Sequence, residues 1–457
     1  MKVLKFGGTS VGTVESLANV KAIVEGIDEP VIVVVSALGG LTDKLIATAN
    51  MAAAADDTYK EEYERIVTRH NDIISGVVPQ HLQDEVHTIV DPLLKELGDV
   101  YLGISLLQDL SPRTLDRVVS FGERLSSVII SRMIEGAIHF NSPDFIYTDS
   151  RHGRHMLDDE ESLPRIKEVF TSTPFTRAIV PGFIARDRKG RFTNLGRGGS
   201  DYTAAILAAA LDAHTLEIWT DVDGFMTADP RILPDAHVID RLSFVEAMEL
   251  CNFGAKVIYP PTIYPVFHKG IPIYIKNTFR PWVPGTCISD AEGNRQHRHM
   301  SGVTSLKDIH VVTVSAAEGT ELAAHRGRMV NLLSRNGVTI YNLVNDSAIN
   351  SFRFAVRGAD VDRALDTLNN EYAPELQTGE ISGIEVSDSL TMIAIVGDNL
   401  QQSAEEMWRR VNAMLADNAI VPHALSEGSS ATTLSFVVEK AQEHQALRLL
   451  HDMYLKF

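Results

Sequence analysis

The chain has 457 residues, which at roughly 150 residues per domain predicts about three domains. Hydrophobic residues make up 44% and charged residues 22% of it, a balance that excludes a largely disordered or fibrous protein. The formal charge of −18 would repel nucleic acid and anionic membranes, so we expect neither as a partner. The two cysteines form no disulfide framework, and no apolar stretch has the length of a signal peptide core or a membrane span. These features predict a cytoplasmic protein.

Residues 1–289 alternate short apolar runs with helical patterns. Apolar runs without polar alternation predict strands that are buried on both faces. They lie at 3–6, 31–37, 178–184, 216–219 and 271–275. Helical patterns lie between them, at 14–26, 41–75, 114–135 and 200–211. The alternation predicts an α/β domain in which a mainly parallel sheet is sandwiched by helices.

A polar stretch at 289–299 predicts the main domain boundary, because it lacks apolar periodicity. After it, the order strand, helix, strand, strand, helix occurs twice. The first copy has strands at 309–315, 338–344 and 350–356 and helices at 321–335 and 361–371. The second has strands at 390–396, 420–425 and 432–438 and helices at 404–417 and 442–454. The repeat predicts two α+β modules of βαββαβ order, in which no reactive residues cluster.

Two glycine-rich segments precede predicted helices and expose backbone N–H groups, and the first directly follows a predicted strand, where such groups can bind phosphate. The first, KFGGTS at 5–10, adds the charge of Lys5, although a plain tight turn is the alternative. It is not a Walker A loop. The second, GRGGSD at 196–201, places Arg197 among glycines, where a guanidinium suits carboxylate binding. Here the alternative is that Ser200 or Asp201 only caps the helix.

Two further segments are weaker candidates for a site. WTDVDG at 219–224 and DPR at 229–231 follow a predicted strand, where ligands of α/β sheets bind, and an Asp-Gly turn is the alternative. In SFGER at 120–124, a surface ion pair within the helix is favoured by the segment alone. The histidine patches at 152–155 and 297–299 lack zinc-ligand spacing, so we expect solvated loops and no protein-built metal site.

Seven segments, in this order, resemble the aspartate kinases of the amino-acid kinase superfamily. They are KFGGTSV (5–11), VVSALGGLTD (34–43), SFGER (120–124), GRGGSDYTAA (196–205), WTDVDG (219–224), DPR (229–231) and FGAKV (253–257). The segments LGISLL (102–107), WTDVDG, EAMEL (246–250) and IKNT (275–278) resemble most the kinase portion of bifunctional aspartokinase–homoserine dehydrogenases. The chain ends about where a dehydrogenase would begin, which leaves open a monofunctional protein or a portion of a longer one.

The resemblance implies a catalytic amino-acid kinase domain at 1–289 and two ACT-like regulatory modules at 300–388 and 389–457. In the family the first module is inserted within the second, so residues 300–308 could belong to the second. The family also implies a homodimer or larger oligomer that assembles through these modules. It implies an amino-acid effector, threonine or alternatively lysine, at the loops 316–321 and 397–402.

The implied reaction is phosphorylation of the β-carboxylate of L-aspartate by ATP with Mg²⁺, the first step toward lysine, threonine and methionine. By resemblance, Lys5 would hold the transferred phosphoryl group and Asp201 would orient Lys5. Glu123 would bind the α-ammonium and Arg197 the α-carboxylate of the substrate.

The family assigns the remaining contacts to a larger set of residues. Thr42 would line the substrate pocket; Gly7, Gly8, Thr9, Ser36, Gly198, Gly199, Ser200, Thr220, Asp221, Arg231, Lys256 and Val257 would hold the phosphates or the nucleotide. Two alternatives stay open at this point. One is a kinase of the same superfamily with another substrate, and the other is a vestigial kinase that acts as an amino-acid sensor.

Overall fold

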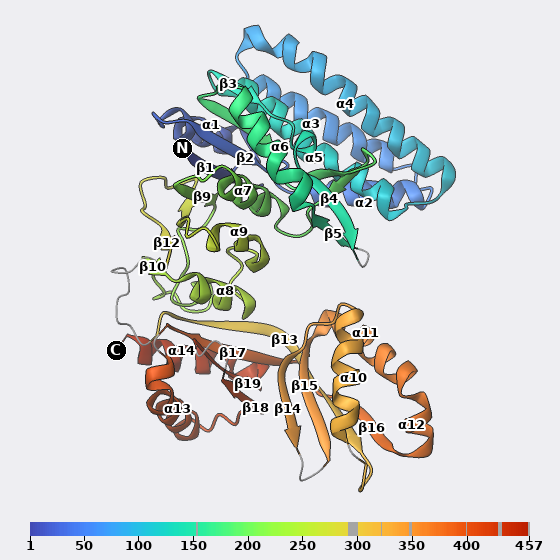
Figure 1. The fold of residues 1–457 in the computed structure, drawn as a ribbon, viewed down its shortest axis with the longest axis vertical. Helices are drawn as coiled ribbons and strands as arrows, with labels where there is room; N and C mark the ends of the chain where they lie inside the picture. The colour runs from blue at the N-terminus through green and yellow to red at the C-terminus, as the bar shows by residue number, and fades with distance from the viewer. Residues whose placement is uncertain are drawn as a thin grey trace. The chain divides into compact units, whose positions relative to one another are not determined.

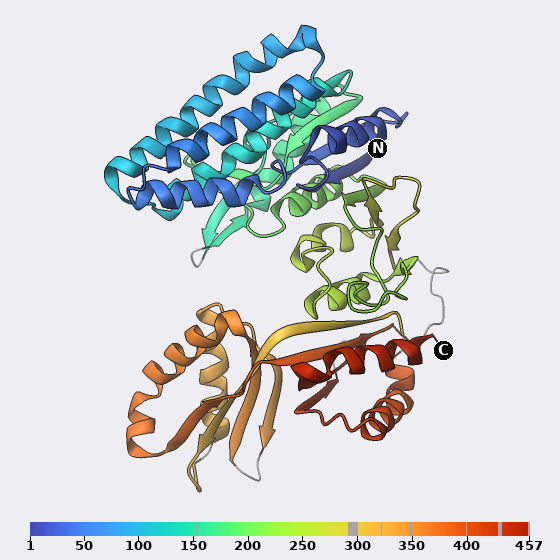
Figure 2. The same ribbon diagram turned by 180° about the vertical axis from the view of Figure 1, so that it is seen from behind.

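The computed structural model describes residues 1–151, 154–290, 300–320, 322–346, 350–398, 400–427 and 432–455. The chain forms two compact units (Figures 1 and 2). Unit 1 comprises Met1–Phe225, Val238–Phe244 and Val257–Asn294, and unit 2 comprises Met226–His237, Val245–Lys256 and Arg295–Phe457. Most of the predicted boundary segment, residues 291–299, and the histidines at 152, 297 and 299 lie outside the described residues.

The centre of unit 1 is a sheet in the order β10-β12-β11-β9-β1-β2-β6-β3. Its strands are β1 (Lys2–Phe6), β2 (Val31–Val35), β3 (Ala137–His139), β6 (Arg177–Pro181), β9 (Thr215–Thr220), β10 (Arg241–Leu242), β11 (Ile273–Asn277) and β12 (Thr286–Ile288). All neighbouring pairs are parallel except β11 and β12. The predicted mainly parallel sheet is therefore confirmed, and its apolar runs form the central strands.

Helices cover both faces of this sheet. The helices α1 (Val14–Glu25), α2 (Leu41–Ala53), α3 (Tyr59–Val77), α4 (Gln80–Leu107) and α5 (Pro112–Met133) share one apolar core with Leu4, Phe6 and alternate residues of β2. Side chains alternate between the faces of a strand, so Val3 and Lys5 point to the other face. That face is covered by α7 (Gly199–Ala210), which packs on β1, β2 and β9.

The sequence predicted one helix over 41–75, and the structure has two. The break lies at 54–58, where Ala55 adopts a left-handed backbone with φ of +56°. The Asp56 carboxylate then accepts a hydrogen bond from the backbone N–H of Thr58, at 3.0 Å. Such a turn competes with helix continuation, because the carboxylate replaces a helical acceptor. The helix α4 that follows was not predicted.

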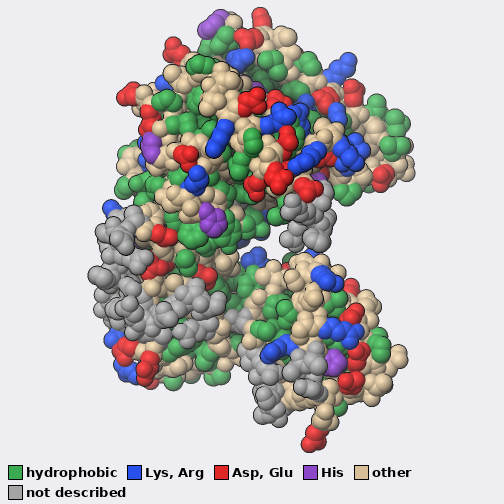
Figure 3. All heavy atoms as spheres, in the orientation of Figure 1, with side chains coloured by type: hydrophobic (Ala, Val, Ile, Leu, Met, Phe, Trp, Pro, Cys, Tyr) green, Lys and Arg blue, Asp and Glu red, His purple; other side chains and the backbone are tan. Residues whose placement is uncertain are grey.

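A second, four-stranded sheet of unit 1 was also not predicted. Its order is β5-β4-β7-β8, with β4 at Tyr147–Arg151, β5 at Arg154–Leu157, β7 at Ile184–Asp187 and β8 at Phe192–Asn194. The predicted strand 178–184 divides between the two sheets: β6 ends at Pro181, and Phe183 turns the chain into β7 with φ of +64°. Ion pairs form on the surface near the adjacent helix α6 (Asp159–Ser172), where acidic and basic side chains are interspersed (Figure 3).

Unit 2 is built on one sheet in the order β14-β15-β13-β17-β19-β18, with β16 also paired to β13. The strands are β13 (Gly302–Ala316), β14 (Tyr341–Asp346), β15 (Ser351–Arg357), β16 (Ile381–Val386), β17 (Leu390–Val396), β18 (Ala424–Glu427) and β19 (Thr433–Glu439). The helices are α10 (Leu322–Arg335), α11 (Gly358–Glu371), α12 (Ala373–Thr378), α13 (Leu400–Asp417) and α14 (Glu443–Tyr454). The predicted α+β order is confirmed, although α12 and β16 were not predicted.

Strand β13 joins the two halves of unit 2. Its residues 302–306 pair with β17, and residues 309–315 pair with β15. Between them the register shifts, and Asp308 adopts a left-handed backbone with φ of +56°. One strand therefore serves both modules, which lie side by side in a single sheet.

Two segments from before residue 289 also pack in unit 2. Ala228 and Leu233 belong to the apolar core that contains Leu447 and Leu450 of α14. Within the segment 245–256, which carries most of α8 (Phe244–Asn252), Glu246 accepts a hydrogen bond from the backbone N–H of Asp398 at 3.0 Å. No helix in the described part of the chain is both long and apolar enough to cross a membrane.

Candidate active site

A cavity of about 360 Å³ lies in unit 1, at the carboxyl ends of the central strands. It is lined by Lys5, Gly8, Ser36, Ala37, Leu38, Gly40, Thr42, Asp43, Glu123, Phe183, Gly196, Gly198, Gly199, Ser200 and Asp201. These residues come from segments that are far apart in the sequence. Nine of them were predicted site residues, so the fold brings nine of the 17 predicted residues to one cavity.

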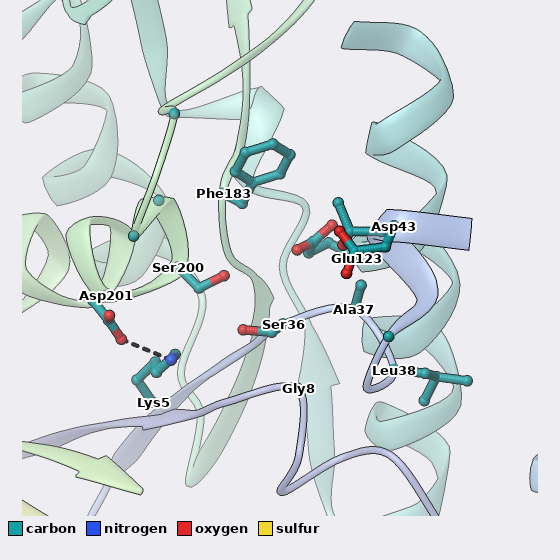
Figure 4. Close-up of a pocket in the computed structure, with 15 residues that line it drawn as sticks. Lys5, Gly8, Ser36, Ala37, Leu38, Asp43, Glu123, Phe183, Ser200 and Asp201 are labelled. Carbon is teal, nitrogen blue, oxygen red and sulfur yellow. Dashed lines mark ion pairs between the residues drawn. The ribbon is translucent and has the colours of Figure 1, made fainter. Parts of the chain in front are cut away.

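The cation of the cavity is Lys5. Its ammonium nitrogen lies 2.7 Å from Oδ1 of Asp201, and the two side chains are only 12% and 13% exposed. Lys5 leaves the end of β1 on the face that α7 covers, and Asp201 lies in the first turn of α7. The alternation of β1 therefore places the ammonium against the start of that helix, where the carboxylate holds it (Figure 4).

Glu123 approaches the cavity from the opposite side, on α5. Its side chain is only 4% exposed, and one carboxylate oxygen has no hydrogen-bond partner. Burial raises the pKa of Glu123 to about 8, against hydrogen bonds from backbone groups of Ala37 and Glu123 and the charge of Lys5, which lower it. An unsatisfied, buried carboxyl at a cavity wall is suited to receive a cationic group.

The surface ion pair that the SFGER segment favoured is not formed by Glu123. Arg124 instead pairs with Glu96 of α4, at 3.1 Å, and lies over the rings of Phe121 and Phe192. Consecutive residues of a helix point about 100° apart, so Arg124 faces α4 while Glu123 faces the cavity. The alternative for this segment was therefore wrong.

Two glycine loops form the floor of the cavity and touch each other. We call residues 7–12, after β1, loop 1, and residues 36–40, after β2, loop 2. A Cβ on Gly39 would lie 2.9 Å from the carbonyl oxygen of Gly8, and one on Gly8 would lie 3.4 Å from Cα of Gly39. No side chain fits at Gly39, so backbone meets backbone there.

Loop 1 is hydrogen-bonded to the end of β9 and to the residue that follows β11. The backbone N–H of Gly7 donates to the carbonyl of Trp219, and the Ser10 hydroxyl lies 2.7 Å from that of Thr278. The Ser10 N–H also donates to the carbonyl of Gly7, which makes the tight turn that was the alternative for this segment. Turn and cavity wall are thus the same structure, since Gly8 of this turn lines the cavity.

Helix α7 begins at the cavity without a side-chain cap. Its N-cap is Gly198, with φ of +70°, and no side chain accepts a hydrogen bond from the first turn. Neither Ser200 nor Asp201 is the cap that the sequence offered as the alternative. The N–H of Gly199 donates to the carbonyl of Gly196, so the N–H groups of Ser200 and Asp201 and the Ser200 hydroxyl are the donors available beside Lys5, and they favour an anion.

Several predicted residues do not line the cavity. Six of them belong to unit 1: Gly7, Thr9, Arg197, Thr220, Asp221 and Val257. The other two, Arg231 and Lys256, belong to unit 2. Arg197 is exposed, and its guanidinium lies 6.0 Å from the centre of the Tyr259 ring. Arg231 binds Asp229 of its own segment, at 2.7 Å.

The WTDVDG segment has a structural partner in β11. Asn277 donates to the carboxylate of Asp223 at 2.7 Å, and Arg280 pairs with the same carboxylate. Gly224 is buried, and a Cβ there would lie 2.4 Å from the hydroxyl of Thr286. The backbone bends through residues 221–224, where the Asp-Gly turn was the alternative, and Asp221 is exposed.

Six cavity residues were missed by the sequence analysis: Ala37, Leu38, Gly40, Asp43, Phe183 and Gly196. Asp43 lies in the VVSALGGLTD segment, next to the predicted Thr42, so its position was detectable. Phe183 gave no signal, because it lies inside a predicted strand and reaches the cavity only through its left-handed backbone.

The cavity has two chemically different sides (Figure 4). Glu123 and Asp43 lie on one side, the Lys5–Asp201 pair lies on the other, and the hydroxyls of Ser36 and Ser200 lie between them. Within the described residues, no group of three or more His, Cys, Asp or Glu side chains is arranged to hold a metal ion. Such a site can hold an amine on one side and an anion on the other, between backbone donors.

The fold is an α/β domain with a cavity at the carboxyl ends of its central strands, followed by a repeated α+β unit. Residues 1–277 match the model of the amino acid kinase family, and the chain belongs to that family. Over 464 residues it is 32% identical to the bifunctional aspartokinase/homoserine dehydrogenase of Haemophilus influenzae. That alignment covers 99% of this chain and 56% of the relative, so the chain spans little more than half of the relative's length.

Solved structures of aspartate kinases share the fold over nearly the whole chain. E. coli aspartokinase III, in complex with aspartate and ADP, is 26% identical with a TM-score of 0.83, and the match covers 99% of each chain. The aspartate kinase of Clostridium acetobutylicum is 24% identical with a TM-score of 0.82, covering 99% of this chain and 100% of that one. The second likeness bears on the fold alone.

Proposed function

We propose that the protein transfers the γ-phosphoryl group of ATP to the β-carboxylate of L-aspartate, forming 4-phospho-L-aspartate and ADP. The observation that carries this proposal is the two-sided cavity, in which buried Glu123 faces the Lys5–Asp201 pair. The E. coli structure with aspartate and ADP supports it, because that protein holds both ligands on the same fold.

The chemistry requires little beyond charge and position. A β-carboxylate is already an anion at neutral pH, so no general base is needed. One of its oxygens attacks the γ-phosphorus, and the bond from that phosphorus to the bridging oxygen of ADP breaks. The site must offset the repulsion between two anions, which Lys5 and the backbone donors of the glycine loops would do.

The ends of the amino acid would be bound by residues of opposite charge. Glu123 would bind the α-ammonium, Arg197 the α-carboxylate, and Thr42 would line the pocket between them. The contrast in burial fits these roles: Glu123 is buried and unsatisfied, whereas exposed Arg197 is free to turn toward a ligand from its place over the Tyr259 ring.

We propose that ATP is bound by the glycine loops and by the residues that the family assigns to the nucleotide. The cavity fits phosphates, since glycine-rich backbone at Gly8 and Gly198 and the start of α7 at Ser200 and Asp201 lie at its wall. Mg²⁺, when bound with ATP, neutralises charge between the phosphates. The carboxylates that line the cavity do not form a group of three or more ligand side chains among the described residues, so a bound Mg²⁺ would keep most of its water ligands.

We propose further that unit 2 is a regulatory pair of ACT-like modules that assembles the protein as a homodimer or larger oligomer. The strands β14 and β18 are the two outermost in the strand order of this sheet, and an outermost strand can pair with a strand of another chain. Light scattering at micromolar concentration is expected to give at least twice the 50.2 kDa chain mass. A monomer would contradict this.

An amino acid is the effector that fits this arrangement. A structure of E. coli aspartokinase III contains lysine together with aspartate, which supports effector binding in proteins of this fold. We propose threonine for this chain, with lysine as the alternative, at loops 316–321 and 397–402. Glu321 and Asn399 of these loops lie outside the described residues. Activity that is unchanged by millimolar threonine, in active and assembled protein, would contradict the choice of threonine.

The reaction is tested by coupling ADP release to NADH oxidation, with Mg-ATP and either aspartate, glutamate or no acceptor. Added hydroxylamine traps an acyl phosphate as a hydroxamate, which separates transfer from ATP hydrolysis. We expect product with aspartate and little with glutamate, since one more methylene moves the carboxylate out of line. Preference for glutamate would indicate another amino-acid kinase. Aspartate binding without ADP release would indicate a sensor.

A further inference from the structure

Arg69 of α3 lies outside the cavity lining but joins the two glycine loops that form its floor. Its Nη2 donates to the carbonyl of Gly12, at 3.0 Å, and to the carbonyl of Gly39, at 2.8 Å. Gly12 is the last residue of loop 1, and Gly39 lies one residue before the end of loop 2. One nitrogen therefore bridges both loops, and we call these two bonds the Arg69 bridge.

We propose that Arg69 is a positioning residue for phosphoryl transfer, one that fixes loop 1 against loop 2 without touching either substrate. The proposal rests on the proposed function for its kinetic consequence only. The structural consequence, a fixed separation of the loops, holds for any ligand of the cavity.

The Arg69 bridge lies where the backbones of loop 1 and loop 2 approach each other closely. A Cβ on Gly12 would lie 3.1 Å from the carbonyl oxygen of Gly8, and one on Gly39 would lie 2.9 Å from the same oxygen. At this contact the loops meet through the backbone of Gly8, Gly12 and Gly39, none of which has a side chain. Glycine-rich backbone is conformationally free, so an external tie is needed to keep it in one arrangement.

The bridge also orients a peptide group. In a trans peptide the C=O and the N–H point in opposite directions. The carbonyl of Gly39 points to Arg69, so the N–H of the same peptide, that of Gly40, points away from it. Gly40 lines the cavity and adopts φ of +72° as the N-cap of α2, without a side-chain cap. Arg69 would thereby hold a backbone donor toward a bound anion.

Arg69 has no competing role among the described residues. No carboxylate of the described chain lies within ion-pair distance of it, although most other arginines of unit 1 pair with Asp or Glu. Partial burial lowers its pKa from the ordinary value, as expected for a guanidinium bound only to neutral carbonyls. Its helix packs on both α1 and α2, the two helices that the loops enter.

Arg177 provides a matched control. It also donates only to backbone carbonyls in the described structure, those of Val24, Glu25 and Glu135, but at the opposite end of the central sheet from the cavity. Replacing Arg177 by Gln removes an equivalent tie that does not reach the loops. Arg69→Lys is the conservative variant, because an ammonium can donate to both carbonyls from a single nitrogen, as Nη2 does.

The test is hydrogen–deuterium exchange of the whole protein, followed by mass spectrometry, on Arg69→Gln, Arg69→Lys and Arg177→Gln. The reporters are the protected amides of Ser10 and Val11 in loop 1 and of Ser36 and Leu41 at loop 2. We expect exchange at these amides to rise about tenfold or more in Arg69→Gln, with an intermediate effect in Arg69→Lys. Arg177→Gln should leave these amides unchanged.

Kinetics provide the second readout. Arg69→Gln is expected to lower kcat by roughly 10–100-fold, since small misplacements of binding groups are costly, and Arg69→Lys to recover part of it. Unchanged exchange in Arg69→Gln would overturn the proposal, and so would faster exchange that is spread over the whole chain and not confined to the loops. If Arg69→Gln does not fold, Arg69→Lys decides: an intermediate rise confined to the loop amides supports the proposal, and a rise spread over the whole chain overturns it. An inactive wild-type enzyme would refute the proposed function, while exchange would still decide the role of Arg69.

Discussion

The ammonium of Lys5 lies 2.7 Å from the carboxylate of Asp201, although 196 positions separate them in the sequence. An ion pair of this kind, in which both side chains are mostly buried, holds the ammonium group in one direction. Because the Lys5–Asp201 pair forms one wall of the cavity, an incoming phosphate would meet a cation that is already oriented. Preorganised charge is the largest contribution that a protein makes to transfer between anions.

Replacing Lys5 by Ala should lower kcat by about 100-fold or more, because it removes the oriented cation. Steady-state ADP release measures this. Lys2→Ala is the matched control, since Lys2 lies on the same strand but pairs with Glu29 and Glu217 outside the cavity. A Lys5→Ala protein with near-normal turnover would refute the role of this lysine.

Replacing Arg197 by Ala should weaken aspartate binding and leave ATP binding nearly unchanged. Loss of a charged hydrogen bond to the α-carboxylate would raise the KM for aspartate by roughly 10–100-fold. Arg191→Ala serves as the control, since Arg191 pairs with Asp187 and does not line the cavity. If the KM for ATP rises instead, Arg197 contacts the nucleotide.

The affinity for aspartate should depend on the protonation of Glu123. The pKa of Glu123 is raised to about 8 in the free protein, and only its ionised form binds an ammonium well. The Kd for aspartate is therefore expected to fall about tenfold per pH unit between pH 6 and 7.5 and to level off above pH 8. Calorimetric titration measures this, and binding should release protons. A Kd that does not change over this range would contradict the assignment.

Glu123 should also reduce stability at alkaline pH. Its folded-state pKa, about 8, is above its ordinary value of 4.5, so the folded state retains the proton longer than the unfolded state. The stabilisation by the neutral form is fully present below pH 4.5 and is lost as the pH rises to about 8. Glu123→Gln has no such group to ionise.

Thermal unfolding of Glu123→Gln and wild-type protein checks this expectation. At pH 9 the variant should be more stable by an amount on the order of a few kcal/mol, and at pH 4.5 the two should differ little. Equal melting temperatures at pH 9 would show that the carboxylate is satisfied in the folded protein. The same variant should lose aspartate binding, so that stability and function change in opposite directions.

Sequence by itself determined five consecutive strands of the central sheet, β11, β9, β1, β2 and β6, and the helix–strand order of unit 2 apart from α12 and β16. Strands buried on both faces need continuous apolar runs, and such runs are visible without any tertiary information. The sequence did not show the helix break at Asp56, where a side chain replaces a helical hydrogen-bond acceptor. It also did not show the second sheet of unit 1, because the strands of that sheet are short and polar. The motifs also supplied nine cavity residues, and all of them except Glu123, which lies within α5, are at the end of a strand or the beginning of a helix.

Only the tertiary structure decided which side chains face one another. Nothing in the SFGER segment shows that Glu123 is buried at the cavity while Arg124 turns to Glu96, since this depends on how α5 is rotated against α4 and the sheet. Likewise, Arg69 lies in an ordinary helical pattern, and its acceptors are two carbonyls, which carry no residue signature. Side-chain type can be read from sequence, whereas the partner of a side chain is set by the packing of distant elements.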